Sequence, residues 1–130
     1  MSRTSYVLIA SAGVFNLAFA AFHLFFWRLF RWPEQLPRLS AVNAGIMQVL
    51  NLCLTYLLAI AGAVCLIFPL SMGTSELGRF LLLALTGFWI ARAIYQPMFF
   101  RLAHPVSTVL FLLFIAGAAL HGIAWAIAGN

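Results

Sequence analysis

Four long apolar segments, separated by three short polar breaks, make up almost the whole sequence. They cover about residues 6–30, 42–68, 77–100 and 106–127. Each is longer than the roughly 20 residues that a helix needs to cross a hydrocarbon core about 30 Å thick. The segments lack the alternation of apolar and polar positions that is typical of strands, and a bilayer core accepts only helices or closed barrels. The pattern therefore predicts four transmembrane helices.

The breaks between the segments carry residues that end and begin helices. The first break, residues 31–38, holds two prolines and three charged residues. Ser40 is placed to cap the second helix, and Pro105 fits the first turn of the fourth. Such short connections make consecutive helices antiparallel. We therefore expect residues 1–130 to form a single all-α domain, an integral membrane bundle of four antiparallel helices in up-down-up-down order.

The composition also indicates a membrane protein. Hydrophobic residues are 65% of the chain and charged residues 7%, whereas a soluble domain usually has about 25% charged residues. A chain this short has no core large enough to bury so much apolar surface, so the lipid must solvate most of it. We expect a multi-pass protein of a bacterial-type inner membrane or an equivalent membrane. The net charge of +5 lies mostly beside apolar segments, which favours the membrane surface as its partner and excludes nucleic acid.

The arginines predict an orientation in the membrane. The first and third breaks, with their flanks, carry four of them: Arg28, Arg31, Arg38 and Arg101. The side with both termini and the second break carries two, Arg3 and Arg79. Because cytoplasmic loops are enriched in basic residues, this bias favours both termini outside, although a dual topology stays open. The first apolar run ends in a signal-peptide-like Ala18-Phe19-Ala20 but continues beyond it, so we expect the first span to be retained.

Polar residues inside the apolar segments form three stripes, one on each of the first three predicted helices. Spacings of three, four or seven residues place side chains on one helix face. The stripes are Asn16 and His23; Gln48, Asn51 and Thr55; and Trp89, Arg92 and Gln96. At about 1.5 Å per residue, His23, Gln48 and Arg92 lie at depths that agree to within one helical turn, in the cytoplasmic half of the membrane. If the stripes face the bundle axis, five residues converge in one layer: His23, Gln48, Asn51, Arg92 and Gln96. With Asn16, farther along the first stripe, they are the six ligand-binding candidates.

Arg92 is the most informative of these residues, because a charge within the bilayer is costly and tends to be functional. The two acidic residues of the sequence, Glu34 and Glu76, both lie in breaks. One interpretation is a polar cavity in which the guanidinium fork holds an anionic or carbonyl-bearing ligand. The alternative is that Arg92 extends toward the cytoplasmic surface and bonds Gln96, Asn51 and backbone carbonyls.

The histidines and methionines are weaker candidates for chemistry. His23 is open to three readings: a member of a packing network, a proton carrier, or a metal or haem ligand. A ligand role needs a second ligand at the same depth. His104 and His121 lie at other depths, and Met47 and Met98 give only a weak soft-metal signal. We therefore predict no metal site, and the sequence indicates no particular cofactor.

Two further features favour packing or membrane anchoring. Ala118 and Gly122 flank His121 and predict a close helix contact in which His121 bonds a neighbouring helix. An aromatic cluster ends the first segment and fits an interfacial belt, with a platform for a flat ligand such as a quinone as the alternative. The cluster consists of Phe25, Phe26, Trp27 and Phe30.

Three functions stay open. The first is binding or transport of an anionic or carbonyl-rich small ligand, or of a lipid headgroup, at the polar layer. Transport would need a homo-oligomer, because four spans enclose little space. The second is a structural or assembly role in which the layer only sets helix packing. The third is a membrane enzyme acting on a lipid or quinone, which is disfavoured because no nucleophile–base set or carboxylate pair is visible.

Overall fold

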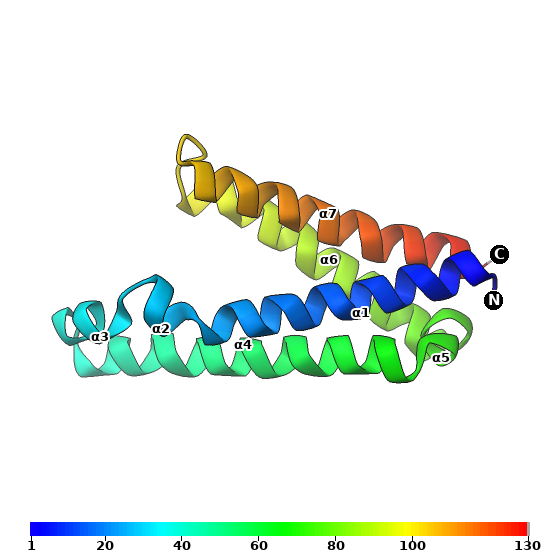
Figure 1. Ribbon diagram of the computed structural model, residues 1–130, viewed down its shortest axis with the longest axis horizontal. Helices are drawn as coiled ribbons and strands as arrows, with labels where there is room; N and C mark the ends of the chain where they lie inside the picture. The colour runs from blue at the N-terminus through cyan, green and yellow to red at the C-terminus, as the bar shows by residue number, and fades with distance from the viewer. Residues whose placement is uncertain (130) are drawn as a thin grey trace. The chain divides into compact units, whose positions relative to one another are not determined.

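A computed structural model describes residues 1–129 and shows an all-α protein (Figure 1). Four of its helices are long and apolar enough to cross a membrane: α1 (Arg3–Leu24), α4 (Ala41–Ile67), α6 (Glu76–Phe99) and α7 (Pro105–Ala128). Shorter helices connect them: α2 (Phe26–Leu29), α3 (Trp32–Gln35), the 3-10 helix η1 (Leu36–Arg38) and α5 (Pro69–Thr74). The predicted fold class is confirmed, and the four apolar helices make this a multi-pass membrane protein.

The last three predicted spans agree with α4, α6 and α7 to within about one residue at each end, but α1 ends earlier than expected. It stops at Leu24, where the amide of Phe25 donates to the carbonyl of Phe22 at 3.1 Å in a tighter turn. The 22 residues of α1 already extend about 33 Å, which covers the hydrocarbon core. The aromatic residues that follow can therefore leave the helix and form short interfacial elements.

Helix starts follow the capping signals of the sequence. The Ser40 hydroxyl accepts a hydrogen bond from the amide of Asn43 at 3.3 Å, as predicted for the cap of α4. Ser75 caps α6 by accepting from the amide of Gly78 at 3.0 Å. Pro105 stands in the first turn of α7, where its missing N–H costs no helical bond.

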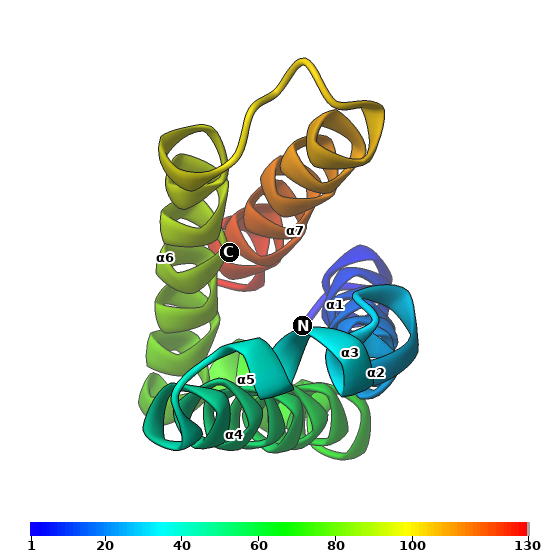
Figure 2. The same ribbon diagram turned by 90° about the vertical axis from the view of Figure 1, so that its left-hand side faces the viewer.

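The chain forms two compact units. The first unit is Met1–Ala12 with the chain from Val64 onward, and the second is Gly13–Ala63. In the first unit, α6 and α7 pair antiparallel and are joined by an open loop at one end (Figure 2). Its core combines α1, α4, α5, α6 and α7 through Ile9, Cys65, Met72, Leu82 and Ala124. A single domain stays a prediction.

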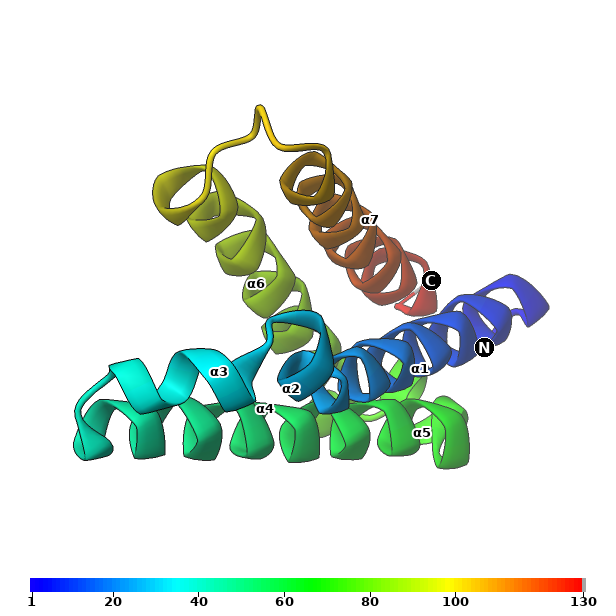
Figure 3. The ribbon, with the colours of Figure 1, turned by 60° about the vertical axis from the view of Figure 1, so that its left-hand side comes forward.

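In the second unit, α1 and α4 run antiparallel and approach closely at Gly62. A Cβ atom on Gly62 would lie 2.8 Å from the carbonyl oxygen of Gly13 and 2.6 Å from Cγ of Leu17. Glycine is therefore required there by the distance between the two backbones. After α1, the short helices α2, α3 and η1 fold back along the first turns of α4 (Figure 3).

Candidate functional site

His23 and Asn51 are joined by two hydrogen bonds in the second unit. Asn51 Nδ2 donates to the main-chain carbonyl of His23 at 3.0 Å, and Asn51 Oδ1 lies 2.8 Å from the imidazole Nδ1. Since the carbonyl can only accept, the amide NH2 must face it, and Oδ1 must face the ring. The imidazole hydrogen is thus on Nδ1. The same contact satisfies a carbonyl at the end of α1, where helical partners run out.

The other polar residues predicted in this unit have different surroundings. Gln48 Nε2 donates to the carbonyl of Ala44 at 3.1 Å, within its own helix. Thr55 does the same to the carbonyl of Asn51 at 2.8 Å. Asn16 is fully buried. Of the four ligand-binding candidates in the second unit, the structure brings His23 and Asn51 into direct contact.

Gln96 connects α6 to α7 in the first unit. Its Nε2 donates to the hydroxyl of Ser107 at 2.9 Å, with the Ser107 carbonyl at 3.5 Å. The side chain is only 2% exposed, yet its Oε1 has no hydrogen-bond partner within residues 1–129. Nearly all buried polar atoms in proteins are satisfied, so an orphan acceptor indicates a missing donor.

Arg92, one helical turn before Gln96, lies against aromatic rings. Its guanidinium carbon is 4.3 Å from the centre of the Phe114 ring and 6.0 Å from that of Phe100. Cation–π contacts of this kind are attractive but do not neutralise the charge. In the part of the chain that the structure describes, the salt bridge is Arg31–Glu34, and Arg92 has no carboxylate beside it.

The predicted alternative for Arg92 included a hydrogen bond to Gln96, and the orphan Oε1 shows that this bond is not formed. Arg92 therefore carries an unneutralised set of N–H donors, and Gln96, one turn further along α6, carries a buried acceptor without a partner among residues 1–129. Pro97 adds to this polarity, because it has no N–H to donate to the carbonyl of Ala93. The predicted convergence of residues from both units in one layer stays a prediction.

The remaining histidines lack a metal-binding arrangement among residues 1–129, where no three His, Cys, Asp or Glu side chains form a group that could hold an ion. His121 is fully buried, and its Nδ1 bonds the carbonyl of Gly117 at 2.7 Å. This partner is in the same helix, and the bond to a neighbouring helix that the sequence suggested stays a prediction. A Cβ atom on Gly122 would lie 3.3 Å from Cγ2 of Thr86 in α6, which agrees with close packing of the two helices.

Two features were not predicted. Arg79 donates to the carbonyl of Trp125 at 3.1 Å and lies 5.5 Å from the centre of its ring, which ties α6 to α7 at the end far from Arg92. A pocket of about 530 Å³ also lies beside the short helices, walled by Trp27 and Trp32. The prolines at 33 and 37, next to an aromatic run, were the sequence signal for a folded connection there.

These features define an all-α, multi-pass membrane protein with a charged site on one helix. Comparisons with models of protein families, with curated proteins and with solved structures gave no match. Functional inference therefore depends on the residues of this chain.

Proposed function

We propose that this membrane protein binds a small anionic or carbonyl-rich ligand, or a lipid headgroup, through Arg92 with the help of Gln96. The observation that carries the proposal is the Arg92 guanidinium, which lies in a membrane-crossing helix against Phe114 without a carboxylate partner among residues 1–129. An unneutralised charge in a bilayer is energetically unfavourable, and a bound anion would offset part of that unfavourable free energy.

The chemistry of Arg92 fits such a ligand. A guanidinium offers five N–H donors in a planar fork, which matches the two oxygens of a carboxylate or phosphate. The Phe114 ring beneath it restricts the fork and lowers the entropy lost on binding. The location, about 10 Å from the end of α6, is reached from the membrane surface by a small headgroup.

Gln96 supplies a complementary group. Its Nε2 is held by Ser107, so its orientation is fixed and Oε1 is the atom left to accept. Because Oε1 is buried, a ligand with an O–H or N–H next to its acidic group would satisfy both residues only if it displaced the side chains that cover Oε1. Of the six residues predicted for the ligand layer, Arg92 and Gln96 carry this proposal.

A structural or assembly role is the second candidate, favoured by the His23–Asn51 pair. These two residues satisfy each other, which is what packing residues do and leaves little for a ligand to gain. In this alternative, Arg92 would be used to contact another protein or another copy of the chain.

Native mass spectrometry of gently extracted protein distinguishes ligand binding from a structural or assembly role. A small molecule should co-purify with the wild type and be lost in Arg92→Gln. Arg92→Lys keeps the charge but not the fork and should weaken binding about tenfold or more. Arg79→Gln is the matched control, since Arg79 also stacks on an α7 ring but is already bonded to a carbonyl. If neither the wild type nor Arg92→Gln carries a bound small molecule, the result would contradict ligand binding.

A further inference from the structure

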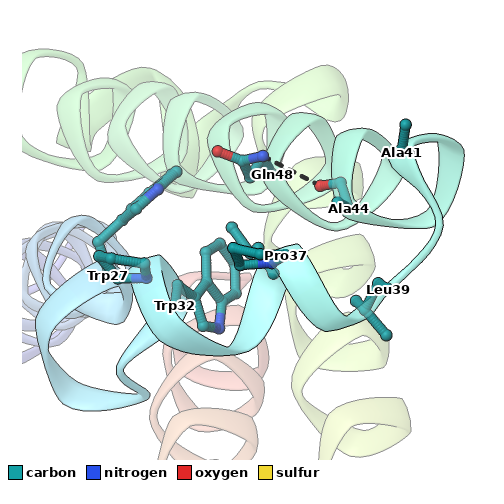
Figure 4. Close-up of a pocket in the computed structure, with 9 residues that line it drawn as sticks. Trp27, Trp32, Pro37, Leu39, Ala41, Ala44 and Gln48 are labelled. Atoms are coloured by element: carbon teal, nitrogen blue, oxygen red, sulfur yellow. Dashed lines mark hydrogen bonds between the residues drawn. The ribbon is translucent and has the colours of Figure 1, made fainter.

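The connection between α1 and α4 forms a pocket of about 530 Å³ that the Arg92 site does not involve (Figure 4). Its volume is in the range of about 300–1,000 Å³ typical of small-ligand sites. One wall comes from the short helices and the other from the first turns of α4. The lining includes Trp27, Trp32, Pro37, Ala44 and Gln48.

The wall made by the short helices is aromatic and ordered. The rings of Trp27 and Trp32 meet edge to face with centroids 4.9 Å apart, and Phe26 contacts Trp32 at 5.8 Å. Trp32 is only 7% exposed. The turn that brings these indoles together passes through Arg31, which has φ 50° and ψ 41°, a left-handed conformation. Such a backbone is unfavourable without glycine and persists where packing around it compensates.

The opposite wall offers a fixed polar group. Gln48 Nε2 is held by the carbonyl of Ala44 at 3.1 Å, so its Oε1 is the atom left for another contact. Figure 4 shows this amide on α4 across the pocket from the two indoles. An apolar wall facing one oriented amide suits an amphipathic ligand better than a purely apolar one.

Three arginines lie in the short segment that forms the aromatic wall of this pocket. Arg28, Arg31 and Arg38 are all exposed, and Glu34 pairs with Arg31. Arg28 directly follows the lining residue Trp27, and Arg38 directly follows Pro37. Because this segment joins two membrane-crossing helices, it lies at the membrane surface, where indole rings prefer to sit and arginines attract anionic lipids.

We propose that this pocket binds an anionic phospholipid. An acyl chain lies along the indole and proline wall, the ester region reaches the Gln48 amide, and the phosphate is attracted by Arg28 and Arg38. The site is separate from Arg92, so it is independent of the proposed function.

The test uses protein reconstituted in vesicles of phosphatidylcholine with phosphatidylglycerol, in which bromine on the acyl chains of one lipid quenches tryptophan fluorescence. Brominated phosphatidylglycerol should quench the wild type more than brominated phosphatidylcholine at the same mole fraction. A variant with Trp27→Phe and Trp32→Phe should lose this excess, which assigns it to the pocket. Arg92→Gln should retain it.

Two sets of variants locate the binding. Replacing Arg28 and Arg38 by Gln should lower the preference for phosphatidylglycerol by about fivefold per arginine. Ala44→Phe should fill the pocket and remove the preference. Gly45→Phe is the matched control on the next position of α4, because a Cβ there meets nothing within 4 Å, and it should keep the preference.

Equal quenching of the wild type by both lipids would overturn the proposal, as would the same result for Ala44→Phe and Gly45→Phe. Sedimentation of both variants in detergent tests another occupant. A change from dimer to monomer in Ala44→Phe alone, with lipid preference intact, would assign the pocket to a contact between copies of the chain and overturn the lipid site.

Discussion

Asn51 holds His23 by both ends of its amide, with Nδ2 at 3.0 Å from the main-chain carbonyl and Oδ1 at 2.8 Å from the imidazole Nδ1. One side chain on α4 thus sets the ring tautomer and satisfies a main-chain carbonyl near the end of α1. This contact joins two helices through side-chain chemistry as well as through apolar packing.

Replacing Asn51 should therefore loosen the α1–α4 pair. We expect Asn51→Leu to lower the free energy of unfolding by about 1–3 kcal/mol, because it leaves the His23 carbonyl and ring unsatisfied. A double-mutant cycle with His23→Phe should give a coupling of about 0.6–1.7 kcal/mol, the range for polar contacts between membrane helices. Unfolding in mixed detergent micelles measures both. Additive effects of the two substitutions would mean that the bond between the His23 ring and Asn51 contributes nothing to stability, since His23→Phe keeps the main-chain carbonyl that Asn51 also bonds.

Gly62 should tolerate no side chain. Gly62→Ala places a Cβ 2.8 Å from the Gly13 carbonyl oxygen, so the backbones of α1 and α4 must move apart. A loss of about 1–3 kcal/mol in unfolding free energy is expected from such overpacking. Gly45→Ala is the control, since its Cβ meets nothing within 4 Å and alanine favours helix. If both variants unfold alike, the close approach is not required.

The start of α6 depends on the Ser75 cap. Ser75→Ala removes the acceptor for the Gly78 amide and should reduce stability by about 1 kcal/mol. Ser75→Thr keeps the hydroxyl, which accepts from the Gly78 amide and donates to the Ser71 carbonyl at 2.7 Å, and should unfold like the wild type. Thermal unfolding followed by circular dichroism compares the three proteins, and a threonine variant as unstable as the alanine variant would contradict capping.

The Gln96–Ser107 contact should respond unequally to changes on its two sides. Ser107→Ala leaves the buried Nε2 of Gln96 without its hydroxyl partner, which we expect to cost about 1 kcal/mol or more. Gln96→Leu removes the whole amide, including the orphan Oε1, and should be closer to neutral. Chemical unfolding of each variant in micelles is the measurement. A larger loss for Gln96→Leu would show that Oε1 has a stabilising partner in the membrane.

Much of the fold could be predicted because each signal is local. Long apolar runs require helices in lipid whatever their neighbours do, so α4, α6 and α7 agree with the expected spans to within about one residue. Ser40 and Pro105 act within one helical turn, and their roles were readable for the same reason. The end of α1 was missed, and there the His23 carbonyl accepts from Asn51, 28 residues away in the sequence, a contact that no local signal reports.

The polar contacts were harder to predict, because several partners of similar energy compete for each side chain. Gln48 and Thr55 bond carbonyls of their own helix, whereas Asn51, on the same stripe, reaches across to α1. Sequence spacing places these residues on one face but does not decide which of them turns inward to its own backbone.

The amino-acid sequence alone was enough to establish a membrane protein of four apolar helices with an arginine inside the third, since hydropathy and helix length act residue by residue. The tertiary structure decided which polar groups are satisfied. In the structure, Asn51 bonds His23 and Ser107 bonds Gln96. The Arg92 guanidinium lies against the Phe114 ring, and the Trp32 ring contacts that of Trp27. Each of these pairings depends on helix rotation and on backbone separation, which follow from packing over the whole chain.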